Sequence, residues 1–79
     1  MIAEFDNLKN TYITIIQLGI TADVSYQEAK LGNDLLHKFC ESFVENSNYL
    51  DSVKMAMKQE LELIKEALSE EIKSYYLHK

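Results

Sequence analysis

The chain has 79 residues, which is enough for one small domain. It carries eight lysines and no arginine against 13 acidic residues, a net charge of −5. Nucleic-acid binding needs a basic surface, and arginine is the usual reader of guanine edges, so we expect no nucleic-acid partner. Because the chain has no proline and only two glycines, it lacks the turn residues of a multi-stranded sheet, and we predict an all-α fold.

The first predicted helix covers about residues 2–18. Its apolar side chains recur at steps of three and four and share one broad face: Ile2, Phe5, Leu8, Tyr12, Ile15 and Ile16. The β-branched residues within 11–16 offer a competing strand. Strict alternation fails there, because Ile15 and Ile16 are adjacent and both are apolar. We therefore predict a helix.

The second predicted helix covers about residues 25–45. Gly19 is expected to end the first helix in a left-handed conformation, and Ser25 with Glu28 forms the pattern of a capping box. The expected core positions of this helix are Ala29, Gly32, Leu36, Phe39, Cys40 and Phe43.

The third predicted helix covers about residues 49–77, after the polar stretch 45–48. Its apolar stripe consists of Leu50, Val53, Met57, Leu61, Ile64, Leu68, Ile72 and Tyr75. At 1.5 Å per residue it would span roughly 43 Å, against about 26 and 31 Å for the other two helices. We predict one helical domain over residues 1–79, an antiparallel three-helix bundle or hairpin whose last helix overruns its partners.

The overrun leaves apolar side chains of the last helix in need of a cover. The connection 19–24, a second copy of the chain or another protein could supply it. We expect a homodimer, because it is the simplest solution for a short chain. The candidate interface residues are Leu68, Ile72, Tyr75, Tyr76 and Met55. For Met55 the alternative of an isolated apolar surface residue stays open.

Two groups of polar residues invite a chemical interpretation. Asp34, His37 and Glu41 include an Asp-x-x-His pair like those of helical di-metal sites, but the chain has no second pair. We expect these residues on the solvated flank of the helix and predict no metal. Cys40 with His37 could form a nucleophile and base, yet a thiol on the buried stripe is inert. We therefore predict no enzyme activity and no cofactor.

The cellular setting follows from what the sequence lacks. Cys40 is alone, the first residues carry no basic segment of a secretory signal, and the apolar runs are far too short to span a bilayer. We expect a cytoplasmic protein without a membrane partner.

These observations favour a small non-enzymatic protein–protein interaction module that self-associates and regulates or adapts a larger partner. The alternative is an acidic inhibitor, of the kind encoded by phages or mobile elements, that blocks a nucleic-acid-binding protein or a nuclease. A one-sided acidic face would favour the inhibitor. The acidic residues are spread along the chain, so we rank the module first.

Overall fold

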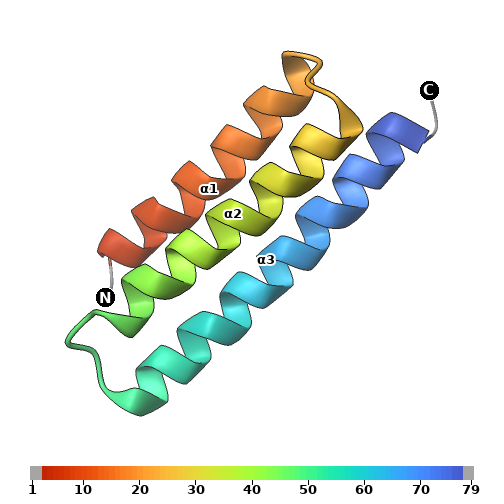
Figure 1. The fold of residues 1–79 in the computed structure, drawn as a ribbon. Helices are drawn as coiled ribbons and strands as arrows, with labels where there is room; N and C mark the ends of the chain where they lie inside the picture. Colours follow the sequence, from red (N-terminus) through yellow and green to blue (C-terminus); the bar gives the residue numbers. More distant parts are fainter. Residues whose placement is uncertain (1–2, 78–79) are drawn as a thin grey trace.

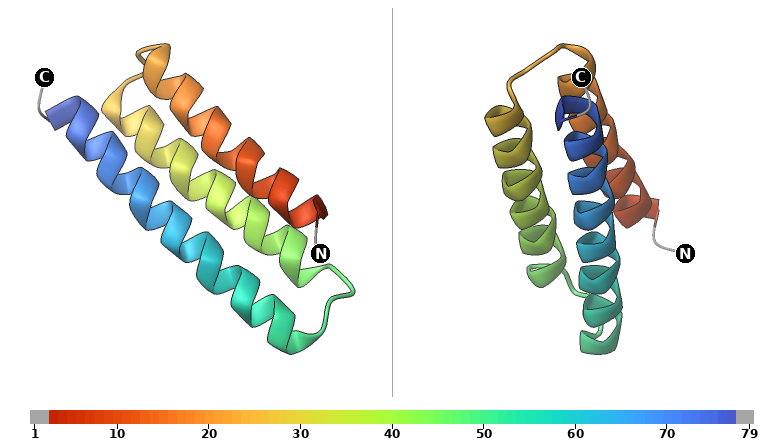
Figure 2. Two further views of the ribbon diagram at one scale, coloured as in Figure 1. Left: turned by 180° about the vertical axis from the view of Figure 1, so that it is seen from behind. Right: turned by 90° about the vertical axis from the view of Figure 1, so that its right-hand side faces the viewer.

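The computed structural model describes residues 3–77, and within them it contains three helices and no strand. α1 is Ala3–Thr21, α2 is Tyr26–Glu45 and α3 is Asp51–Leu77. Consecutive helices run antiparallel, with α2 and α3 side by side and α1 packed against both (Figures 1 and 2). The molecule is elongated, 43 × 18 × 17 Å. The prediction of an all-helical chain with a long last helix is confirmed.

Residues 11–16 are helical, as predicted, but the first helix ends later than expected. Gly19 lies inside α1, and the left-handed residue is instead Asp23, with φ of 64°. Asp tolerates this conformation better than most residues because its short polar side chain bonds locally. The turn is closed by the Asp23 amide, which donates to the carbonyl of Ile20 at 3.0 Å. The connection to α2 is therefore shorter than predicted.

The predicted capping box at the start of α2 is confirmed. The Glu28 amide donates to Ser25 Oγ at 3.1 Å, and the Ser25 amide donates to Glu28 Oε1 at 2.9 Å. These bonds favour the carboxylate and lower the pKa of Glu28 below its usual range. The other end of α2 is closed by Asn46, whose amide donates to the carbonyl of Ser42 at 3.0 Å.

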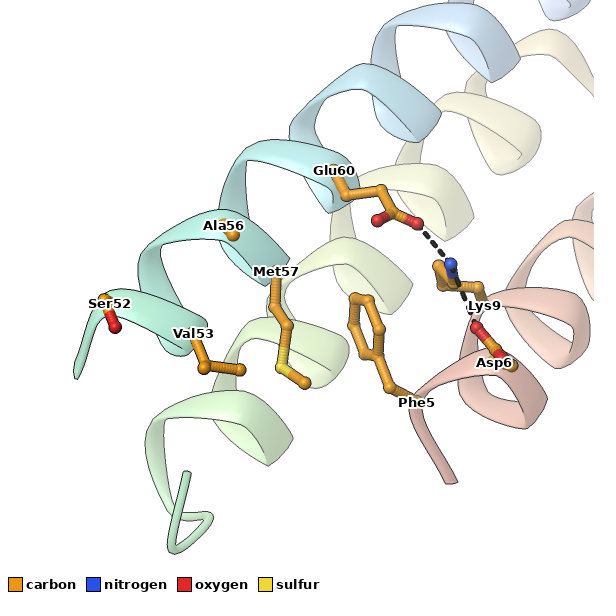
Figure 3. Close-up of a pocket in the computed structure, with 8 residues that line it drawn as sticks. All are labelled: Phe5, Asp6, Lys9, Ser52, Val53, Ala56, Met57 and Glu60. Atoms are coloured by element: carbon orange, nitrogen blue, oxygen red, sulfur yellow. Dashed lines mark hydrogen bonds and ion pairs between the residues drawn. The ribbon is translucent and has the colours of Figure 1, made fainter. Parts of the chain in front are cut away.

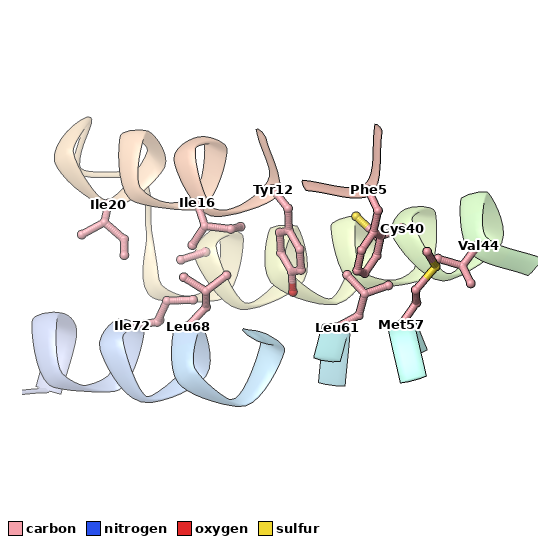
Figure 4. Packing of buried hydrophobic residues seen from close by; sticks show 11 residues of the cluster. Phe5, Tyr12, Ile16, Ile20, Cys40, Val44, Met57, Leu61, Leu68 and Ile72 are labelled. Carbon is pink, nitrogen blue, oxygen red and sulfur yellow. The ribbon is translucent and has the colours of Figure 1, made fainter. Parts of the chain in front are cut away.

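The core lies along the line where the three helices meet (Figure 4). Tyr12 projects from α1 into the middle of this line, between α2 and α3. Each large apolar side chain buried here contributes roughly 1.5–3 kcal/mol. The buried apolar residues are Phe5, Tyr12, Ile16, Ile20, Ala29, Cys40, Val44, Met57, Leu61, Leu68 and Ile72.

The predicted core face of α2 is partly wrong. Ala29 and Cys40 are buried, but Phe39 is 62% exposed, and Gly32, Leu36 and Phe43 are only half-buried. The helix is rotated so that two polar residues, Asn33 and His37, lie in the interior. Periodicity predicts polar side chains at the surface, but Asn33 and His37 lie beside polar groups of Lys65 and Glu62 on α3.

Two further core predictions also need correction. Ile15 of α1 is 47% exposed, while Ile20, beyond the predicted helix end, is buried. Leu50 is 73% exposed and lies just before α3, which begins at Asp51. Ile2 lies outside the described residues. Within residues 3–77, no helix combines the length and apolar character needed to cross a membrane.

Candidate functional site

Asn33 is buried between α2 and α3 and links all three helices. Its Nδ2 donates to the carbonyl of Lys65 on α3 at 3.1 Å, and the Tyr12 hydroxyl of α1 donates to its Oδ1. Burial raises the pKa of Tyr12 far above its usual range, so the phenol stays protonated and able to donate. These directional bonds fix which turns of the three helices face one another. Asn33 was not among the predicted functional residues, because in the sequence it is only one polar residue beside apolar core positions.

His37 lies one turn further along α2 and is 5% exposed. Its Nε2 is 3.1 Å from Glu62 Oε2 on α3, and its Nδ1 is 3.8 Å from Glu41 Oε1 on α2. The contact with Glu62 is close but lacks the alignment of a hydrogen bond. Within residues 3–77, Nε2 is therefore buried without a hydrogen-bond partner. The expectation that His37 faces solvent is wrong, because this side of α2 packs against α3.

The structure regroups the acidic residues that were expected around His37. Glu62 of α3 joins His37 and Glu41, and one potential ligand atom from each residue lies within 4.8 Å of the others. Asp34 is not part of this cluster and pairs with Lys65 at 3.6 Å. Glu62 was missed because helix pairing, which sequence periodicity does not specify, brings it to His37.

Ion pairs follow the solvent-exposed edge of the α2–α3 contact. Lys58 of α3 bonds to the carboxylate of Glu45 on α2, and Lys54 donates to the Glu45 carbonyl at 3.0 Å. The bond from Lys58 lowers the pKa of Glu45 and raises that of Lys58. These pairs are exposed and screened by water, so they orient the helices more than they stabilise them.

Cys40 has none of the features of a nucleophile. It is 1% exposed, and burial raises the pKa of its thiol to about 11. The reactive thiolate is therefore scarce near neutral pH, and the side chain packs as a small apolar group. The expected burial of Cys40 is confirmed. His78, the other histidine, lies outside the described residues.

The predicted interface at the end of α3 is mostly covered by the chain itself. Leu68 is buried, and Ile72 is only 1% exposed, so neither side chain is available to a partner. The prediction came from the greater length of the last helix compared with both of the others, with the first helix expected to end near residue 18. The longer α1 brings Ile20 into the core at this end.

The connection between α1 and α2 also covers the end of α3. The Tyr76 hydroxyl donates to the carbonyl of Val24, and the Tyr76 ring lies 5.9 Å from that of Tyr26. Tyr75 stacks edge-on against Tyr76 and is 37% exposed. Met55, near the other end of α3, is 64% exposed. Of the five predicted interface residues, Met55 and Tyr75 thus remain at the surface and Tyr76 is half-buried.

A further group of exposed apolar side chains lies on α2, where none was predicted. Leu31, Leu35 and Phe39 are exposed and spaced four residues apart, which puts them on one side of the helix. We call this set the outer face of α2. It borders a groove of about 160 Å³ between α1 and α2. The groove is lined by Ile15, Ile16, Gly19, Val24, Glu28, Ala29, Gly32 and Leu36.

A second groove, of about 400 Å³, lies between the N-terminal halves of α1 and α3 (Figure 3). Phe5 and Met57 form its apolar part, and Lys9 crosses one end. Lys9 pairs with Asp6 at 3.3 Å and bonds to Glu60 of α3, which raises the pKa of Lys9. The charged residues of this groove, Asp6, Lys9 and Glu60, are thus paired with one another.

Comparison with models of protein families, with curated protein sequences and with solved structures gives no significant match to this chain.

Proposed function

We propose that this protein is a small non-enzymatic protein–protein interaction module that self-associates and regulates or adapts a larger partner. The observation that carries the proposal is the outer face of α2, with Leu31, Leu35 and Phe39 each more than half exposed. A helix that is apolar on its core side and again on its outer side is typical of a helix buried on both sides. A contiguous apolar surface of this kind marks an association site.

The occupant we propose for this face is a second copy of the chain. Two-fold contacts are the commonest in homo-oligomers, and they place the same surface of both copies face to face. In an antiparallel pair of α2 helices centred on Leu35, Leu31 of each copy faces Phe39 of its partner, so the exposed apolar side chains of the two copies cover one another.

Sedimentation of the Leu35→Glu variant tests the proposal. A charge at the centre of the contact would have to be buried, so we expect at least a ~10-fold weaker dimer than wild type at ~100 μM protein. Leu35 is exposed, so helicity measured by circular dichroism should be unchanged. Leu63→Glu is the matched control, because Leu63 is an exposed leucine on α3. A monomeric wild type, or a dimer lost in the control and kept in Leu35→Glu, contradicts the proposal.

The acidic inhibitor ranks second. Such a protein needs a face of acidic residues free to meet basic groups of its target. Here lysines lie among the acids along both contacts of α3, with Lys9 on Glu60, Lys58 on Glu45 and Lys65 on Asp34. This mixing of charges supports the interaction module.

A further inference from the structure

We propose, in reversal of the expectation from sequence that His37 and Glu41 hold no metal, that His37, Glu41 and Glu62 form a binding site for a divalent transition-metal ion such as Zn²⁺ between α2 and α3. The site is independent of the association surface proposed above, since its residues lie on the side of α2 that packs against α3. Imidazole nitrogen and carboxylate oxygen are common ligands of such ions.

The helix geometry explains how the three side chains meet. Glu41 follows His37 by four residues and therefore lies beside it on α2. Glu62 comes from the adjacent α3 and brings its carboxylate to the other ring nitrogen. A site shared by two helices in this way places ligands on rigid elements, which limits the rearrangement that binding requires.

The distances are close to those that a tetrahedral ion needs. Zinc ligands at about 2.0–2.2 Å from the ion lie roughly 3.4 Å from one another. Nε2 of His37 and Oε2 of Glu62 are already 3.1 Å apart. Glu41 lies 3.8 Å from the other ring nitrogen, Nδ1, so its partly exposed side chain must change rotamer to reach the same ion.

The buried imidazole gives a second reason, independent of the acidic residues. A buried polar nitrogen without a hydrogen-bond partner is unfavourable and needs an explanation. In the described part of the chain, Nε2 of His37 is such an atom, and it lies 3.1 Å from a carboxylate oxygen of Glu62. A cation bound between them would be coordinated by the lone pair of Nε2 and by an oxygen of the Glu62 carboxylate.

The surrounding charges also favour a cation. Lys58, whose charge acts on Glu41, is bonded to Glu45, and Lys65 pairs with Asp34. The two carboxylates beside His37 therefore leave the cluster negative. Because Glu41 and Glu62 are partly exposed, an ion can enter from solvent, and water can complete its coordination as in open zinc sites.

Isothermal titration of the full chain, without an affinity tag and in a non-chelating buffer, tests the site with zinc chloride as the probe. We expect about one ion per chain with micromolar affinity, and His37→Gln and Glu62→Gln should each weaken binding at least ~10-fold. Glu62 is half-exposed, so Glu62→Gln should stay folded even if His37→Gln does not. The matched controls are His78→Gln, which removes the other histidine, and Glu71→Gln on the exposed side of α3. Both should bind like wild type.

A second measurement separates metal binding from a simple ion pair. In nitrogen-15 spectra of the imidazole, zinc should shift the resonances of His37 at constant pH and leave those of His78 unchanged. The proposal is overturned if the chain takes up no zinc at ~1 mM, where even weak sites fill. It is also overturned if zinc shifts only His78, or if Glu62→Gln binds as tightly as wild type.

Discussion

The two sides of α2 contact their neighbouring helices through different chemistry. Toward α3, the helix buries Asn33 and His37 and lines its edge with ion pairs. Toward α1, it presents Gly32 and Leu36 and leaves an open apolar groove. Polar groups must meet particular partners, so the α3 side specifies how the helices pair. Apolar contact is non-directional, and the α1 side and outer face can therefore accept a further apolar surface.

The variant with the largest expected effect tests whether Ile72 belongs to the interior of the chain. Ile72→Ala should lower the free energy of unfolding by about 2–5 kcal/mol, because a fully buried side chain leaves a cavity. Leu63→Ala on the exposed side of α3 should change it by less than ~0.5 kcal/mol. Urea unfolding monitored by circular dichroism measures both. If Ile72→Ala instead dissociates a dimer and leaves stability intact, the end of α3 is an interface and our comparison fails.

A substitution at Asn33 removes hydrogen bonds from the side of α2 that faces α3. Asn33→Ala removes the side-chain acceptor of the Tyr12 hydroxyl and the donor to the Lys65 carbonyl, and leaves only the backbone carbonyl of residue 33, 3.2 Å from that hydroxyl; it should cost about 2–4 kcal/mol. Asn10→Ala makes the same change at an exposed position of α1 and should be nearly neutral. Thermal unfolding of the two variants gives the contrast. Equal melting temperatures would mean that the buried bonds contribute nothing to stability.

The apolar side should tolerate, and even gain from, an added methyl group. A Cβ built at Gly32 would lie 3.8 Å from Ile16 Cδ1, an ordinary contact. Gly32→Ala should therefore raise the free energy of unfolding by about 0.5–1 kcal/mol, since alanine favours the helix. Denaturant titration is the measurement. A loss of stability would show that the groove must stay open for α1 to pack.

The smallest effect concerns pH and the capping box. The pKa of Glu28 is lowered in the folded chain, so its bonds stabilise the fold above the ordinary value near 4.5 and are lost as the pH falls through the folded pKa. Glu28→Gln keeps a bonding side chain but loses this dependence. The wild type should melt slightly higher than Glu28→Gln at neutral pH, and the difference should vanish in acid. A difference that persists in acid would assign the effect to packing.

The sequence predicted the helices well and their contacts less well, for a physical reason. Periodicity and the Ser25–Glu28 pattern depend on neighbouring residues, and both were confirmed in the structure. The burial of His37 and its approach to Glu62 depend on how α2 turns toward α3, which no local pattern contains. The exposed Phe39 shows the same limit, because an apolar residue on a two-sided helix can face either side.

The bond from the Tyr76 hydroxyl to the Val24 carbonyl joins residues 52 positions apart in the chain. The last turn of a helix ordinarily frays independently and exchanges its amide protons quickly. Here the last turn of α3 is bonded to the connection between α1 and α2. Opening of either segment therefore exposes the other. The end of α3 and the turn around Asp23 should therefore open as one cooperative unit and show matched protection in hydrogen exchange.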